Sequence, residues 1–209
     1  MPIVSAKSKN TSEPVPAGVH HAICFGVIEL GTQEPSDPKF KRNKKVVIMW
    51  ELPHETIETP DGIKPRVISN DYTQSIDQKA TLRGVLESWR GRPFTSDELN
   101  RFDLDNILGV NCQLNIVHKP GKVDPSRTFA RIQGVVPLVK GMSPLKPTNR
   151  IIKYDVPTSG PFEIPDSIPE WIVEKIKKSD EYKAAYGIQP TTPAKAGAIP
   201  SSPSEDVPF

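Results

Sequence analysis

A dense cluster of positive charge surrounds a single aromatic residue in the segment between Gly31 and Lys45. This basic loop contains Lys39, Phe40, Lys41, Arg42, Lys44 and Lys45. Single-stranded DNA offers phosphates to cations and bases to aromatic rings, and each base stack contributes ~1–3 kcal/mol. The loop is therefore a candidate DNA-binding segment. The alternative is a solvated hairpin tip in which Phe40 folds back on the core.

A second set of suitable side chains lies on a strand predicted over residues 128–138. Alternation places Phe129, Arg131 and Gln133 on one face. The other face holds three apolar residues, Ala130, Ile132 and Val136. An aromatic ring, a guanidinium and an amide in line suit a platform for bases and phosphates. Arg66 and Tyr72, on an earlier strand, extend this platform, although Tyr72 fits a core position equally well.

The final residues combine acidic side chains with an apolar hook. Glu205 and Asp206 precede Val207, Pro208 and Phe209. Proline restricts the backbone just before the aromatic anchor, which lowers the entropy lost on docking. This tip resembles the acidic C-terminal tip of bacterial single-stranded-DNA-binding proteins. The resemblance implies that the tip recruits other proteins through an apolar pocket with a basic rim.

Catalysis has little support in the sequence. It contains no Walker loop, GxGxxG or GxSxG motif. His20 and His21 are adjacent, so they point to opposite faces of a strand. Asp103 and Asp105 fit helix caps better than Mg²⁺ ligands. We expect a protein that is not an enzyme and needs no cofactor or metal.

The cysteines and the hydropathy of the chain indicate where it resides. Cys24 and Cys112 lie in apolar runs without a CxxC motif or a His/Cys cluster, which argues against a zinc site and favours buried free thiols. No segment reads as a signal peptide or reaches the ~18 apolar residues of a membrane span. We expect a soluble cytoplasmic protein that does not bind membranes.

Charge is distributed unevenly along the 209 residues. The net charge is +2, but residues 1–150 contain 21 Lys and Arg against 16 Asp and Glu, or +5. Residues 151–209 contain 6 against 9, or −3. A basic body with an acidic end is compatible with a polyanion-binding protein whose tail competes weakly for the site.

Periodicity predicts three strands, a helical insertion and two further strands. The five strands are predicted over residues 18–30, 45–53, 66–73, 110–119 and 128–138. The insertion contains a helix that stops at Gly91 and a short helix in which Thr95 and Glu98 form a capping box. This order predicts a mainly β, five-stranded OB-fold-like barrel. The alternative is an α+β sandwich of the same elements.

Proline is abundant, with 23 residues, and concentrates towards both ends. We predict a flexible arm over residues 1–16 and the OB-fold-like domain over 17–142. Residues 143–187 form an extension with one amphipathic helix over 170–186. Residues 188–209 form a disordered linker that carries the tip.

The central part of the chain is similar to a family of single-stranded-DNA-binding proteins of tailed bacteriophages. The matching residues are Tyr72, Thr73, Lys79, Leu82, Arg83, Leu86–Arg92, Phe94, Thr95, Leu108 and Gly109. The resemblance covers about residues 15–142. The helical insertion is longer and the tip less acidic than in bacterial homologues.

The expected function is sequence-independent binding of single-stranded DNA during phage DNA replication, recombination and repair. The tip would recruit host or phage replication or recombination proteins, and the sequence allows a homo-oligomer. Two alternatives remain: an OB-like adaptor that binds only protein, and an accessory domain of a nuclease or recombination enzyme.

Overall fold

The computed structural model describes residues 13–35, 37–121 and 124–188. The strands in this part of the chain are β1 (Gly18–Gln33), β2 (Asn43–Thr59), β3 (Gly62–Thr73), β4 (Asn111–Pro120), β5 (Thr128–Pro137) and β6 (Ile152–Tyr154). The helices are α1 (Thr81–Arg90), α2 (Ser96–Arg101), the 3-10 helix η1 (Leu104–Ile107), α3 (Glu170–Lys177) and α4 (Asp180–Ala185). The prediction of a mainly β protein with a helical insertion after the third strand is confirmed.

The long strand β1 organises the sheet. Five antiparallel strands follow the order β3-β2-β1-β4-β5. Beyond the segment that pairs with β4, residues 26–28 of β1 pair in parallel with β6. The β1–β2 register shifts between Cys24 and Gly26, an irregularity that a glycine in a strand favours.

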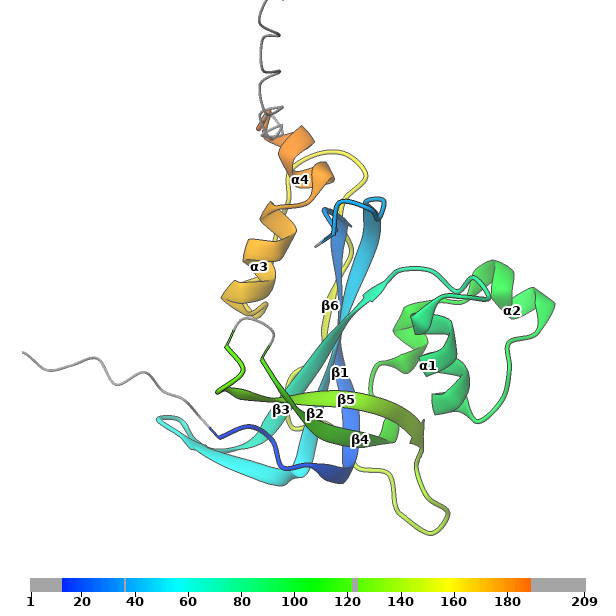
Figure 1. Cartoon of the computed structure of the whole chain (residues 1–209), viewed down its shortest axis with the longest axis vertical. Coiled ribbons are helices and arrows are strands. Elements are labelled where there is room, and N and C mark those ends of the chain that lie inside the picture. The colour runs from blue at the N-terminus through cyan, green and yellow to red at the C-terminus, as the bar shows by residue number, and fades with distance from the viewer. Residues whose placement is uncertain (1–12, 36, 122–123, 189–209) are drawn as a thin grey trace, which may run out of the picture.

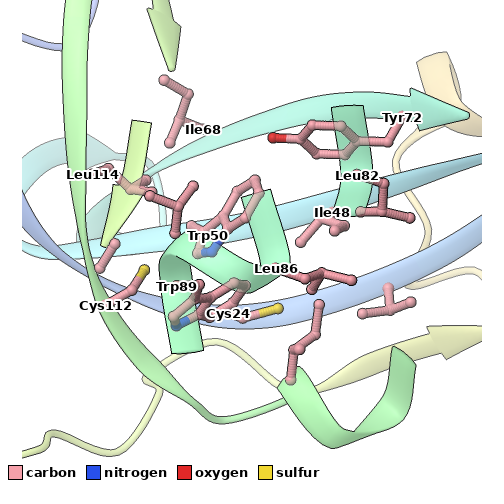
Figure 2. Packing of buried hydrophobic residues seen from close by; sticks show 14 of the residues in the cluster. Cys24, Ile48, Trp50, Ile68, Tyr72, Leu82, Leu86, Trp89, Cys112 and Leu114 are labelled. Carbon is pink, nitrogen blue, oxygen red and sulfur yellow. The ribbon is translucent and has the colours of Figure 1, made fainter. Parts of the chain in front are cut away.

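One face of the sheet packs against α1 and forms the larger core, as Figure 2 shows. Leu82, Leu86 and Trp89 are the buried residues of α1, and the Trp89 ring lies 5.9 Å from that of Trp50 on β2. Leu86 is fully buried. Truncating such a residue to alanine costs about 2–5 kcal/mol, so this interface is a main source of stability.

The opposite face of the sheet packs against the C-terminal part of the chain. Phe25, Val47 and Met49 face a second cluster that includes Ile172 and Ile176 of α3. Figure 1 accordingly shows α3 on one side of the sheet and α1 on the other. Alternate residues of β1 and β2 therefore enter two cores. Residues 143–187 are an integral layer of the fold, because β6 extends the sheet and α3 completes the second core.

The C-terminal helical segment is two helices, so the prediction of one helix over residues 170–186 is wrong. The break falls at Ser179, which is buried and caps α4 by accepting a hydrogen bond from the Tyr182 amide at 3.1 Å. The Ser179 hydroxyl also donates to the Ile176 carbonyl at 2.7 Å. These bonds satisfy groups at both helix ends and stabilise the break.

The helical insertion follows its local signals. α1 ends at Gly91, whose φ of 69° is the left-handed conformation that glycine adopts without strain. Thr95 and Glu98 form the predicted capping box at the start of α2.

Strand β5 differs from its predicted alternation after Arg131. A register shift between Asn115 and Ile116 of β4 leaves Gln133 opposite no partner residue. The extra residue reverses the faces that follow, because side chains alternate with a period of two. Val135 is therefore buried, while Val136, predicted to face the core, is 42% exposed.

The sheet is open in the described residues, because its edge strands β3 and β5 are not paired with each other. Val15, which falls within the arm predicted over residues 1–16, is buried in the larger core. The His118 ring is hydrogen-bonded to the Val15 carbonyl at 2.8 Å, which fixes the start of the described chain beside β4.

Candidate nucleic-acid interface

A groove of about 850 Å³ separates the two edge strands of the sheet. We call it the β3–β5 groove. Its β3 side runs from Lys64 to Ser69, its β5 side from Arg127 to Ala130, and Ile57, Thr59, Asn149 and residues 13–15 complete it. Two strands that are far apart in the sheet order thus face one another across a common hollow. Of the sequence-predicted site residues, the groove brings Arg66 and Phe129 together.

Phe129 offers an aromatic surface beside the groove. Its side chain is 37% exposed. The ring is backed by Gly121, where an added Cβ would lie 2.8 Å from the ring Cε2. The guanidinium carbons of Arg127 and Arg131 lie 5.5 and 5.7 Å from the ring centroid. The arrangement is an aromatic ring supported on glycine and flanked by two cations.

Arg66 contributes a fixed cation on the opposite wall. Its Nη1 donates to the Glu13 carbonyl at 2.6 Å, and its Nε donates to the Thr56 carbonyl at 3.4 Å. Both acceptors are neutral backbone groups, so the guanidinium keeps its charge uncompensated by these bonds. The neighbouring Lys64 is instead paired with Asp61 at 2.8 Å.

The remaining β5 candidates lie next to the groove. Arg131 and Gln133 are exposed, and neither lines the groove itself. The Arg131 guanidinium lies beside the Phe129 ring, and Phe129 in turn lines the groove. Gln133 occupies the bulge described above, so it does not continue the regular platform predicted for this strand.

Tyr72 is placed in the core, and its prediction as a stacking residue is corrected. The side chain is only 4% exposed, and burial raises the pKa of its phenol. A ring enclosed by core residues cannot offer a face to a base. Lys45 lies beside it and lines a separate hollow of about 550 Å³ with Lys79.

The basic loop does not line the β3–β5 groove. Lys39, Phe40 and Lys41 are exposed, Phe40 at 69%. Arg42 is occupied by an ion pair with Asp180 of α4 and lies 3.6 Å from Glu34. The loop is therefore docked towards α4, at one end of the molecule (Figure 1).

The loop end of β1 is fastened to α4 by Glu181. This carboxylate accepts bonds from the Thr32 amide and hydroxyl, both at 2.7 Å. Partial burial alone would raise the pKa of Glu181, but the bonds from Thr32 outweigh it and hold the pKa below its usual value. Lys44 adds a favourable charge interaction.

Most residues that line the groove were not predicted as site residues from the sequence, among them Arg127, Val67 and Asn149. Arg127 precedes Phe129 by two positions, so strict alternation already places the two on one face. Arg127 was not included in the predicted platform, because the strand was predicted to begin at residue 128 and residues 120–127 have the composition of a turn. Val67 and Asn149 carry no chemical signal of their own, and only the folded chain brings them to the groove.

Asn149 is held in place by a buried carboxylate. Glu51 is fully buried on β2 and accepts bonds from the Thr148 amide, the Asn149 amide and the Asn149 side chain at 2.7–2.8 Å. Three donors compensate the carboxylate for its lost hydration. The Glu51 side chain thereby holds the segment of Thr148 and Asn149 against the sheet, and Asn149 lines the groove.

The segment from Trp89 to Arg92 has a structural role. Trp89 is buried, and its indole donates to the Asn111 carbonyl at 3.2 Å. Arg90 and Arg92 both pair with Glu98, and the bond from Arg92 is the largest cause of the low pKa of that carboxyl.

The predicted free thiols are confirmed. Cys24 and Cys112 are both free and buried. Burial raises the pKa of Cys24 to about 12 and that of Cys112 well above its usual value. Thiols this hard to ionise are poor nucleophiles and metal ligands at neutral pH.

Asp103 and Asp105 have structural partners. The Asp103 carboxylate caps η1 by accepting from the Asp105 amide at 2.9 Å, and Asp105 pairs with Lys153. Within the described ranges, no group of three or more His, Cys, Asp or Glu side chains is arranged to hold a metal ion.

The tip from Glu205 to Phe209 and the linker before it lie outside the described residues, apart from Ile188. In the part of the chain that the structure describes, none of the helices is both long and apolar enough to cross a membrane. Comparisons of the chain with protein-family models, curated proteins and solved structures found no match.

Proposed function

We propose that this protein binds single-stranded DNA without sequence preference in the β3–β5 groove. The observation that carries the proposal is the Phe129 ring, half-exposed between Arg127 and Arg131, with Arg66 on the facing wall. Bases stack on such rings whatever their identity, and the cations pair with phosphates. Neither interaction reads a base edge, so the binding tolerates any sequence.

The sheet order supports an OB-fold-like arrangement of this site. OB-folds bind oligonucleotides on their second and third strands and with the loops that join strands 1 and 2 and strands 4 and 5. In this chain, Arg66 lies on the third strand, Arg127 just before the fifth, and the basic loop between the first two. We assign the groove the main share of the affinity and the basic loop an auxiliary electrostatic share.

The resemblance to the phage family suggests the biological setting. We place the activity in phage DNA replication and recombination in the host cytoplasm, where a coating protein protects single strands. This role needs no cofactor and no catalytic turnover. The tip from Glu205 to Phe209 would recruit replication or repair proteins to the coated strand, with many weak tails acting together.

The proposal is tested by fluorescence anisotropy with labelled dT oligomers and a matched duplex at several salt concentrations. We expect preference for the single strand and an affinity that falls steeply with salt, because phosphate contacts release counterions. Phe129→Ala should weaken binding about 5- to 150-fold, the equivalent of one stack. Tyr186→Ala is the matched control, since this exposed aromatic lies beyond α4 and away from the groove.

Each rival function has its own outcome in this experiment. No binding at low salt would reject DNA binding and leave the protein-adaptor alternative. Loss of intact oligomer on adding Mg²⁺ would indicate a nuclease. Deleting residues 201–209 should leave DNA affinity equal or slightly higher, because a competing acidic segment is gone. The same deletion should abolish retention of replication proteins by the coated strand.

A further inference from the structure

A second hollow adjoins the β3–β5 groove on the α3 side of the sheet. This α3 hollow has a volume of about 460 Å³ and extends from Phe25 and Met49 to Pro169 and Trp171. Val67, Ser69 and Asn149 line both the groove and the hollow. The two depressions thus share a wall and form one path from Phe129 to Trp171.

Trp171 is the exposed aromatic at the end of this path. It is 44% exposed, although its neighbour Ile172 is fully buried. Successive helical residues are about 100° apart, so burying Ile172 and Ile176 turns the indole of Trp171 towards the edge of the helix interface. The packing of α3 therefore presents an indole that the second core does not enclose.

A cation accompanies the indole, as at Phe129. The Lys175 Nζ lies 4.9 Å from the Trp171 ring centroid, one helical turn further along α3. Lys175 also pairs with Asp71 on β3, which fixes helix and strand in register. An aromatic ring with an adjacent cation thus occurs at both ends of the path.

The wall shared by the two depressions is rigid. Asn149 is held from beneath by the buried Glu51, and Val67 and Ser69 are residues of β3. Rigid elements hold binding groups in place more accurately than mobile ones. The surface between the two aromatic residues is therefore held by the sheet and by Glu51.

We propose that Trp171 is a second base-stacking platform, so that one DNA strand runs from Phe129 over Val67 and Ser69 to Trp171. This inference rests on the proposed function and adds a binding site on α3, outside the five-stranded sheet. Its occupant is single-stranded nucleic acid, because the α3 hollow continues the β3–β5 groove and the exposed Trp171 indole offers a face on which any base can stack. An OB-like sheet alone would not supply this platform; it depends on the C-terminal extension.

Intrinsic fluorescence of the full chain tests the proposal directly. The other two tryptophans, Trp50 and Trp89, are at most 4% exposed, so quenching by DNA reports on Trp171. We expect dT oligomers long enough to span both platforms to quench the fluorescence of the wild type. Trp171→Phe retains only the emission of Trp50 and Trp89, and we expect the same oligomers to leave that emission unchanged. Trp171→Ala should weaken binding of the long oligomers about 5- to 150-fold and leave the shortest oligomers bound by Phe129 unchanged.

The variants separate failure of this inference from failure of the proposed function. Trp171→Phe retains a ring and should lose less affinity than Trp171→Ala, whereas thermal unfolding identifies any loss of fold. If wild type binds dT oligomers and Trp171→Ala binds the long ones as tightly as wild type does, the second platform is wrong and the groove stands. If wild type binds no single strand, the proposed function itself is wrong. Quenching by an unrelated peptide but not by DNA would assign the α3 hollow to protein.

Discussion

The β3–β5 groove and the basic loop contain the same kinds of side chain but hold them differently. In the groove, Phe129 is backed by Gly121 and flanked by two arginines. In the loop, Phe40 is 69% exposed and Arg42 is paired with Asp180. A ring held in place loses less freedom when a base stacks on it. The comparison teaches that density of charge along the chain does not identify the surface on which the fold holds aromatic and cationic side chains in place.

The largest effect should come from removing the support beneath the groove. Glu51→Ala leaves the three donors of Thr148 and Asn149 without their acceptor in a buried site. We expect the free energy of unfolding to fall by about 2–5 kcal/mol, measured by urea denaturation. The matched control is Glu34→Ala in the loop region, an exposed carboxylate whose loss should change stability by less than about 0.5 kcal/mol. Equal stability of the two variants would contradict a rigidly supported groove wall.

Substitution of Phe129 in the groove should have the next largest effect, on DNA binding, and substitution of Phe40 in the basic loop is its comparison. Phe40→Ala should change the affinity for dT oligomers by no more than about twofold, the effect of an ordinary surface substitution. Phe129→Ala should have the much larger effect stated above. Anisotropy titrations under identical salt conditions measure both. A larger loss for Phe40→Ala would make the basic loop the main site and the groove the auxiliary one.

The two regions should also differ in their contribution to salt dependence. Arg131→Ala should reduce the slope of log affinity against log salt by about 0.7, one phosphate on a single strand. Arg42→Ala should leave the slope nearly unchanged, because Asp180 already neutralises this cation. The outcome that contradicts the comparison is a smaller slope in Arg42→Ala than in Arg131→Ala.

The smallest effect concerns the attachment of the loop end of β1 to α4. The folded state lowers the pKa of Glu181, so this carboxylate binds its proton more weakly in the folded than in the unfolded chain. Its stabilisation is therefore present above the ordinary Glu pKa of about 4.3. It is lost as the pH falls through the lower folded value. The Thr32 amide shift, followed by NMR, should titrate in that acidic window and be pH-independent there in Glu181→Gln.

A titration of the Thr32 amide at or above the ordinary Glu value would contradict this assignment. The Phe129 ring resonances provide the internal comparison. The groove should retain its shifts at the pH at which the loop end first responds, because Glu181 and its partner Thr32 do not line it.

Much of the secondary structure was predictable, because its signals are local. Alternating apolar residues predicted the five main strands, and the capping box of Thr95 and Glu98 predicted the start of α2. Gly91 predicted the end of α1. The break at Ser179 also had a local signal, since Ser179-Asp180-Glu181 is a typical helix start. The amphipathic pattern across residues 170–186 obscured it.

The sequence by itself determined which residue types are available for binding, and the tertiary structure decided which of them meet. Arg66 and Phe129 lie across one groove only because the edge strands of the sheet face each other. Tyr72 is buried in the core, and Trp171 of α3 lines a hollow that shares Val67, Ser69 and Asn149 with the groove. Local patterns specify the period and ends of an element, because their interactions span a few residues. The pairing of distant edges depends on the packing of the whole chain, which short-range spacing does not encode.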